Sequence, residues 1–237
     1  MSSIADNIGS VTRRIQKATL QAGRAPGSVN LLAVSKTRSP EELHAAVKAG
    51  QTAFGENYLQ EALDKMQALS SVNGIEWHFI GPIQSNKTRQ IAEAFAWVHS
   101  VDRLKIARRL SEQRPGEQPP LNICLQVNVN NEASKSGCRL EALDELVAAI
   151  GELPNLRLRG LMAIPDPGQS EADLRLSFRK LASTLSTLRQ NHPESGPLDT
   201  LSMGMSGDLE TAIAEGSTWV RVGTAVFGDR PAKHSQS

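Results

Sequence analysis

Lys36 is the residue whose type and position most directly suggest chemistry. It ends a segment, residues 31–36, that begins with four apolar residues and passes through Ser35. A continuous apolar run bounded by a turn signal is typical of a strand buried on both faces. We therefore expect Lys36 at the carboxyl end of a strand, where α/β proteins place their chemistry. Burial and the like charge of Arg38 would favour the neutral amine, which is the form that attacks an aldehyde cofactor. The alternative is a lysine solvated at the end of a strand.

Two glycine-containing turns late in the sequence could hold an anion. Ser206-Gly207-Asp208 is expected to open a helix over residues 206–215, with Ser206 as its cap and Gly207 leaving room for an anion at the backbone N–H groups. Gly223-Thr224 forms a second turn of small residues after the next expected strand. In barrels of alternating strands and helices, the loops after strands seven and eight often bind phosphate. The alternative is ordinary helix capping combined with a tight turn.

A lysine that faces a phosphate site suggests pyridoxal 5′-phosphate (PLP) as the cofactor. Lys36 would form the Schiff base, and Arg221, at the end of the last expected strand, would lie near the pyridine nitrogen. A guanidinium stays charged and accepts no hydrogen bond. It therefore favours the unprotonated ring and weakens the ring as an electron sink.

These residues need a scaffold that brings distant segments to one face, and the hydropathy pattern predicts one. The spacing of apolar residues predicts an amphipathic helix over residues 3–23. Expected strands then alternate with expected helices, the strands covering residues 31–36, 53–55, 77–80, 97–100, 122–129, 156–164, 200–203 and 219–222. Eight such units in about 200 residues predict a (β/α)8 TIM barrel, a single domain over residues 1–237 with a weak last helix and a flexible tail over 231–237. A doubly wound open sheet is the alternative.

The composition argues against several classes of function. The chain carries 26 basic and 25 acidic side chains and no basic tract, so it does not resemble a nucleic-acid-binding protein. No apolar run approaches the roughly 18 residues of a membrane span, and the first residues lack the apolar region of a secretion signal. The two cysteines, Cys124 and Cys138, make no disulfide framework. We therefore expect a cytoplasmic protein that binds neither nucleic acid nor membranes.

Several sequence blocks occur in the order found in one known family. They are Leu32-Ala33-Val34-Ser35-Lys36-Thr37, Phe54-Gly55-Glu56-Asn57-Tyr58, Trp77-His78-Phe79-Ile80-Gly81-Pro82-Ile83-Gln84-Ser85-Asn86-Lys87, Ser134-Lys135-Ser136-Gly137, Arg159-Gly160-Leu161-Met162 and Leu201-Ser202-Met203-Gly204-Met205-Ser206. Over nearly its whole length the sequence closely resembles the PLP homeostasis protein family. The resemblance implies a barrel of the alanine-racemase type and a protein that manages free PLP and amino-acid balance, with no established catalytic turnover.

The resemblance also implies roles for individual residues. Lys36 would carry PLP as a Schiff base, and Arg221 would face the ring nitrogen. The phosphate would be held by Ser206, Gly207, Gly223 and Thr224, and the ring would be surrounded by Asn57 and Met203. Gly207 stands where relatives often carry a larger residue.

An amino-acid racemase of low activity is the main alternative. Racemisation over PLP needs a base on each face of the cofactor, and related racemases supply the second base as a tyrosine from an additional β-domain. This sequence has no room for that domain, and its only tyrosine is Tyr58. We therefore expect a carrier without efficient catalysis, with no catalytic residue assigned. The expected partners are PLP and PLP-dependent apo-enzymes, and the expected state is a monomer.

Two other kinds of site fit the sequence less well. Residues 81–88 end in Lys-Thr as a P-loop does, but Asn86 replaces the second glycine. His78, His99 and Cys124 lack the spacing of a zinc site, so no metal is expected and His78 is interpreted as a core histidine. Lys135, in the turn after the fifth strand, is either a solvated loop lysine or an auxiliary amine that receives PLP during transfer.

Overall fold

The chain folds as a closed barrel of eight parallel strands, which follow one another around the barrel in sequence order. We describe it from a computed structural model that covers residues 2–132, 135–166 and 168–229. The strands are β1 (Asn30–Val34), β2 (Ala53–Glu56), β3 (Glu76–Phe79), β4 (Trp97–Val101), β5 (Leu121–Gln126), β6 (Leu156–Met162), β7 (Thr200–Ser202) and β8 (Trp219–Val222). The predicted (β/α)8 barrel is confirmed, and the alternative of an open doubly wound sheet is wrong.

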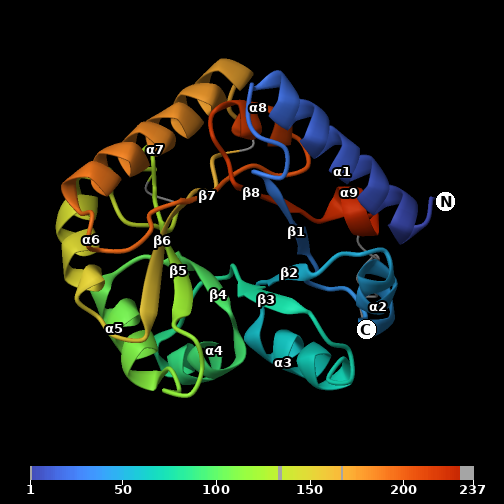
Figure 1. The fold of residues 1–237 in the computed structure, drawn as a ribbon, viewed down its shortest axis with the longest axis horizontal. Helices are drawn as coiled ribbons and strands as arrows, with labels where there is room; N and C mark the ends of the chain where they lie inside the picture. Colours follow the sequence, from blue (N-terminus) through green and yellow to red (C-terminus); the bar gives the residue numbers. More distant parts are fainter. Residues whose placement is uncertain (1, 133–134, 167, 230–237) are drawn as a thin grey trace, which may run out of the picture.

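Helices connect successive strands and surround the barrel (Figure 1). They are α1 (Ile4–Gln21), α2 (Pro40–Lys48), α3 (Leu59–Ala68), α4 (Thr88–Ala94), α5 (Leu104–Gln113), α6 (Leu143–Gly151), α7 (Glu171–Asn191), α8 (Leu209–Ala214) and α9 (Thr224–Phe227), with short 3₁₀ helices η1 (Ser85–Lys87) and η2 (Leu140–Ala142). Ser3 and Ser39 start α1 and α2 with capping boxes. No helix in the described part of the chain is long and apolar enough to cross a membrane. The expected flexible tail, 231–237, lies outside the described residues.

Helix α1 occupies the place that a helix after the last strand takes in a regular barrel. Within the described residues, the helix that follows β8, α9, has four residues, in agreement with the weak last helix that the sequence predicted. The apolar side of α1, including Val11 and Ile15, shares one hydrophobic cluster with residues of β8 and α8. Figure 1 shows α1 beside α8 and α9, and Asn7 Nδ2 donates to the carbonyl oxygen of Val226 over 2.9 Å. Helix α1 therefore covers the pair of strands that closes the barrel.

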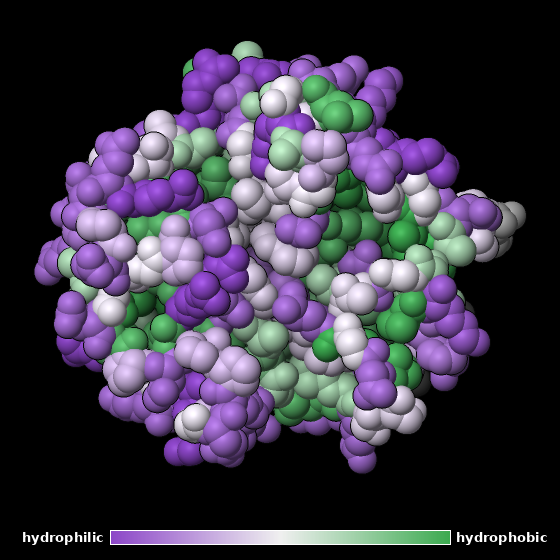
Figure 2. All heavy atoms as spheres, in the orientation of Figure 1, coloured by the Kyte–Doolittle hydropathy of each residue, from purple (hydrophilic) through white to green (hydrophobic). Residues whose placement is uncertain are grey.

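The barrel wall divides the hydrophobic core. Two large clusters fill the space between strands and helices. Because successive residues of a strand point to opposite faces, Leu32 points into the barrel while its neighbour Ala33 packs against the helices. Trp97, Cys124 and Met162 form another small interior cluster. On the face shown in Figure 2, hydrophilic groups dominate the periphery and hydrophobic atoms lie in recesses between them.

The barrel interior also contains two buried histidines, His78 of β3 and His99 of β4. The ring of His78 lies 4.8 Å from that of Trp219, between centroids, and this contact crosses the interior because β8 and β3 are not neighbours. His78 Nδ1 and His99 Nε2 are 2.9 Å apart. Burial lowers the pKa of both rings, that of His99 well below its usual value. His78 is thus confirmed as a core histidine, and both rings are neutral at pH 7.

We predict that the free energy of unfolding falls as the pH drops below about 6.5, the pKa of histidine in an unfolded chain. A histidine whose pKa is lowered by folding binds fewer protons in the native state, so acid favours unfolding. This contribution is fully present above the unfolded pKa and is lost as the pH falls toward the native pKa values. Denaturant unfolding at stepped pH measures the slope.

The control for this prediction is an exposed histidine, His44 of α2. Between about pH 6.5 and 5, His99→Gln should flatten the dependence of unfolding free energy on pH, whereas His44→Gln should leave it unchanged. Identical slopes in the two variants would contradict the prediction.

Candidate functional site

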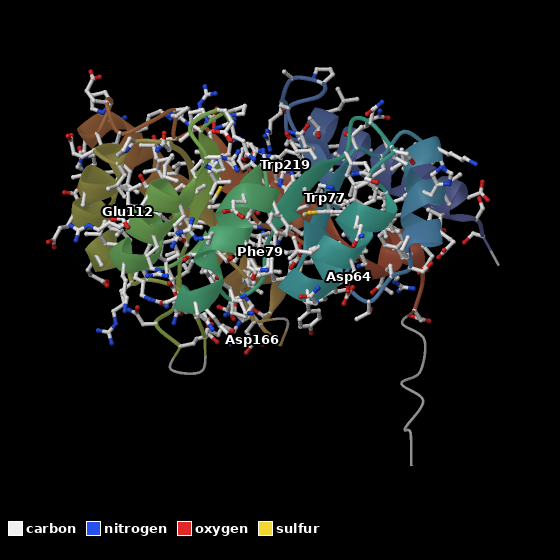
Figure 3. The ribbon with its side chains drawn as sticks, turned by 90° about the horizontal axis from the view of Figure 1, so that it is seen from below. Asp64, Trp77, Phe79, Glu112, Asp166 and Trp219 are labelled. Carbon is white, nitrogen blue, oxygen red and sulfur yellow. The ribbon has the colours of Figure 1, made fainter. Side chains whose placement is uncertain are left out.

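A cavity of about 350 Å³ lies at the carboxyl ends of the strands. In the side view of Figure 3, Trp77 near the start of β3 lies above Phe79 at its end, and Asp166, in the loop after β6, lies at the lower edge. The carboxyl ends therefore face that lower edge. Seven of the eight predicted binding residues line the cavity: Lys36, Asn57, Ser206, Gly207, Arg221, Gly223 and Thr224.

Lys36 lies in a turn rather than within a strand. β1 ends at Val34, two residues earlier than expected, and the amide of Ser35 donates to the carbonyl oxygen of Gly55 over 3.0 Å. Thr37 has a φ of 64°, a left-handed conformation that β-branched residues rarely adopt. Neighbouring groups must hold such a backbone in place.

A buried ionic cluster holds this turn on both sides of Lys36. Glu56 Oε1 accepts a hydrogen bond from Ser35 Oγ over 2.6 Å and one from Lys65 Nζ over 2.7 Å. Lys65 Nζ also donates to the carbonyl oxygen of Ser35 over 2.6 Å. Glu61 Oε1 accepts from Lys65 Nζ and from the amide of Thr37. The ion pair between Lys65 and Glu56 is almost completely buried. Burial raises the pKa of Glu56, and the charge of Lys65 opposes that increase.

Arg38 ties the same turn to the end of α9. Its guanidinium donates to the carbonyl oxygens of Phe227 and Gly228 and lies 5.7 Å from the centroid of the Phe227 ring. The Arg38 side chain also lines the cavity. The sequence predicted Arg38 only as a like charge near Lys36, because carbonyl groups some 190 positions away in the sequence leave no local signal.

The two predicted anion turns line the same cavity, but Ser206 does not cap a helix. Helix α8 begins at Leu209, three residues later than expected, and Asp208 occupies the cap position, where its carboxylate accepts a bond from the amide of Met205. The amides of residues 206–207 and 223–224 precede or open α8 and α9, outside the helical hydrogen-bond ladder. Arg14 Nη2 of α1 donates to the carbonyl oxygen of Ser206 over 3.0 Å.

Asn57 contributes a polar atom that has no protein partner. Its side-chain Oδ1 is buried and accepts no hydrogen bond from the described residues. Its backbone is closely approached by Gly81, where a Cβ atom would lie 2.1 Å from the carbonyl oxygen of Asn57. Only glycine is tolerated there. Buried acceptors are normally satisfied, so Asn57 Oδ1 indicates a donor supplied by a bound group.

Arg221 brings a buried positive charge to the cavity. Nη1 donates to Ser202 Oγ and Nη2 to the carbonyl oxygen of Ala163, both over 2.8 Å. Burial lowers the pKa of Arg221 to about 10, which still leaves the guanidinium charged at pH 7. A charged donor in this position cannot accept a hydrogen bond from a bound ring.

Met203 is the one predicted binding residue that does not line the cavity. Its side chain is fully buried in the hydrophobic core, because β7 ends at Ser202 and the chain reverses at Gly204, whose φ is 95°. Met205, beyond this reversal, lines the cavity instead. The remaining lining residues that the sequence did not indicate are Val34, Ile80 and Ile164, apolar residues that end strands or follow them.

Lys135 lies beside the cavity rather than in its wall. Its Nζ lies 3.3 Å from the carbonyl oxygen of Ile164 and 3.6 Å from Glu132 Oε2. Because Ile164 lines the cavity, Lys135 is near its rim. Its neighbours, residues 133–134, lie outside the described residues.

Among the described residues, no group of three or more His, Cys, Asp or Glu side chains could hold a metal ion.

Comparison with known proteins agrees with this geometry. The family described as alanine racemase, N-terminal domain, matches residues 7–231. The chain is 60% identical to the "Pyridoxal phosphate homeostasis protein" of Pseudomonas aeruginosa over 97% of both chains. It is 51% identical to the protein of the same name from Escherichia coli K12, over 97% of this chain and 98% of the relative.

Two solved structures show the extent of the structural likeness. PipY of Synechococcus elongatus PCC7942 with PLP bound is 35% identical, with a TM-score of 0.84, 95% of this chain covered and 100% of that one. The alanine racemase of Corynebacterium glutamicum is 17% identical, with a TM-score of 0.68; the match covers 98% of this chain but 61% of the racemase. The racemase therefore shares the barrel fold.

We predict that Lys65→Met destabilises the protein by about 3–5 kcal/mol, because it leaves the buried Glu56 carboxylate without a counter-charge. Urea unfolding measures the effect. The double variant Lys65→Met/Glu56→Gln should recover part of the loss, since the uncompensated charge at position 56 is then removed. Arg89→Met, which breaks the exposed pair with Glu93, is the control and should cost about 0.5 kcal/mol or less. A Lys65→Met effect as small as that of the control would contradict the prediction.

Proposed function

We propose that this chain, which belongs to the family of pyridoxal phosphate homeostasis proteins and contains the alanine racemase N-terminal domain, binds PLP as a Schiff base on Lys36. We further propose that it acts in intracellular PLP homeostasis and carriage, without efficient catalysis. The observation that carries the proposal is that Lys36, Arg221 and two small-residue turns line one cavity of about 350 Å³. PipY, which is 35% identical and whose solved structure contains PLP, supports the choice of cofactor.

The residues of the cavity fit the chemistry of PLP. The cofactor supplies an aldehyde, an anionic phosphate and a pyridine ring. The amine of Lys36 matches the aldehyde, and the turns at 206–207 and 223–224 offer hydroxyl and amide donors to the phosphate. Asn57 Oδ1, buried without a protein partner, can accept a hydrogen bond from a polar group of the ring.

The turn at Ser206 and Gly207, which we propose binds the phosphate, is held in place by neighbouring parts of the chain. Arg14 of α1 binds both the carbonyl oxygen of Ser206 and the carboxylate of Glu210. Gly204 makes the preceding reversal possible, because a Cβ atom there would lie 2.5 Å from that of Ala212. Gly207 has open space around it, so the absence of a side chain at this position widens the cavity without removing a backbone donor.

Two features of the cavity favour a carrier over a racemase. Arg221 is a charged donor that would hold the pyridine nitrogen unprotonated and so weaken the ring as an electron sink. Tyr58, the only tyrosine, is 56% exposed and does not line the cavity, so it is not placed as a second base. A racemase of low activity is the alternative, and proton exchange at the α-carbon of alanine in deuterated water distinguishes the two.

We also propose a cytoplasmic location, a monomeric state and PLP-dependent apo-enzymes as acceptors. The near balance of 26 basic and 25 acidic side chains supports a freely diffusing protein rather than one held by nucleic acid or lipid. Lys135, whose Nζ lies near the rim at Ile164, is proposed as either a solvated lysine or an auxiliary amine during transfer.

The central prediction is that the protein loaded with PLP absorbs visible light and that Lys36→Ala loses this absorption. Borohydride reduction followed by peptide mass spectrometry should place the label on Lys36. Ser206→Ala should weaken PLP binding by about 10- to 100-fold, the effect of losing one hydrogen bond to a charged group. Lys48→Ala, on the exposed end of α2, is the control. A reduced label on any other lysine, or full absorption in Lys36→Ala, would refute the proposal.

The role of Lys135 is tested by transfer of PLP to an apo-enzyme. If Lys135 is an auxiliary amine, Lys135→Ala should slow the transfer while leaving the visible spectrum of the loaded protein intact. An unchanged transfer rate would identify it as a solvated loop lysine.

A further inference from the structure

A series of hydrogen bonds crosses the barrel interior from the cavity to the opposite face. Arg221 Nη1 lies 2.8 Å from Ser202 Oγ, which lies 2.7 Å from His99 Nδ1. His99 Nε2 lies 2.9 Å from His78 Nδ1, and His78 Nε2 lies 2.9 Å from Glu76 Oε1. We call these five residues the interior network. The proposed cofactor site uses only Arg221, so the other four need a separate explanation.

The middle of the interior network is closed to water. Ser202, His99 and His78 have no exposed surface, whereas the side chain of Glu76, at the start of β3, is 45% exposed. Trp97 stacks on His78, with ring centroids 5.4 Å apart. The other charged or titratable groups that face the network are Arg159, Asp199, Asp208 and Cys124.

The carboxylate of Glu76 determines the direction of every hydrogen bond in the interior network. A carboxylate can only accept, so His78 carries its proton on Nε2 and donates to Glu76. Because both rings are neutral, His78 Nδ1 accepts from His99 Nε2, and His99 Nδ1 accepts from Ser202 Oγ. The Ser202 hydroxyl in turn accepts from Arg221, whose guanidinium can only donate.

The protonation state of Glu76 supports this assignment. If His78 presented a lone pair to the Glu76 carboxylate, two acceptors would face each other at 2.9 Å. Hydrogen bonding from His78 lowers the pKa of Glu76, and the charge of Arg159 also lowers it. The carboxylate is therefore ionised at pH 7. The ionised carboxylate thus requires the Nε2–H tautomer of each histidine.

We propose that Ser202, His99, His78 and Glu76 are positioning residues for Arg221, and that they hold its guanidinium through a one-directional network in which both histidines are neutral Nε2–H tautomers. The network places a carboxylate at the far end of a series of aligned dipoles that starts at a buried cation. This arrangement stabilises the charge of Arg221 without placing a carboxylate in the cavity. It also commits Nη1 of Arg221 to Ser202 while Nη2 is bound by Ala163, so the guanidinium cannot rotate freely toward a ligand.

The tautomers are measured directly by ¹⁵N NMR of the imidazole nitrogens in the protein before PLP is added. The expected result is a proton on Nε2 and none on Nδ1 for both His78 and His99, with no titration of His99 between about pH 8 and 5. A proton on Nδ1 of either ring would overturn the proposal.

Variants separate the two ends of the network. Glu76→Gln replaces a group that can only accept with a carboxamide that can also donate, so both tautomers of His78 and His99 should appear. Ser202→Ala removes the other end, and Glu76 should still impose the Nε2–H tautomers. The double variant Glu76→Gln/Ser202→Ala should show a mixture of tautomers. A double variant with the wild-type tautomers would show that packing sets them, which would overturn the proposal.

A second measurement applies even if the double variant does not fold. Hydrogen exchange at the Arg221 guanidinium should accelerate by about tenfold in Ser202→Ala, the effect of losing one hydrogen bond. Glu112→Gln, on the exposed face of α5 and labelled in Figure 3, is the matched control and should leave exchange unchanged. Equal exchange in the two variants would contradict the positioning role.

The inference rests on the proposed function only in the ligand assigned to Arg221. Ser202→Ala should weaken PLP binding by up to about tenfold while borohydride still labels Lys36. If the tautomers are as proposed but wild-type protein does not bind PLP, the proposed function fails alone. If PLP binds and Nδ1 is protonated, the positioning network fails alone.

Discussion

The pairing of β1 with β8 is the interaction on which the site depends. Residues 30–33 pair in parallel with residues 219–222, and this ladder turns a row of strands into a closed barrel. Because both strands run in the same direction, their carboxyl ends meet. The turn that carries Lys36 therefore lies beside the turn at Gly223 and Thr224, although nearly the whole chain separates them. An open sheet would leave these groups at opposite edges.

The closing pair needs cover on its outer face, and α1 provides it. The short α9 contributes only two buried residues, Val226 and Phe227, and the hydrophobic side of α1 completes the cluster around β8 and α8. Arg14 of this helix also supports the turn at Ser206. The first helix thus stabilises the barrel and positions one wall of the cavity, which couples folding of the amino-terminal segment to the site.

Buried polar groups arrange the other walls of the cavity. The pair of Lys65 with Glu56 holds the backbone around Lys36, and a second series of polar contacts through His78 and His99 leads to Arg221. Desolvation makes such groups costly unless each is satisfied. They hold the geometry of the cavity in place before a ligand arrives.

The sequence by itself determined the alternation of strands and helices, the position of Lys36 after a strand, and most of the cavity lining, because these follow from local periodicity, turn residues and a specific family resemblance. Only the tertiary structure decided which methionine faces the cavity: Met203 is buried and Met205 is exposed to it, since the chain reverses at Gly204. It also decided the contacts of Arg38, Lys65 and the two histidines. Those contacts join residues far apart in sequence, and they depend on strand register and barrel closure, which no local pattern specifies.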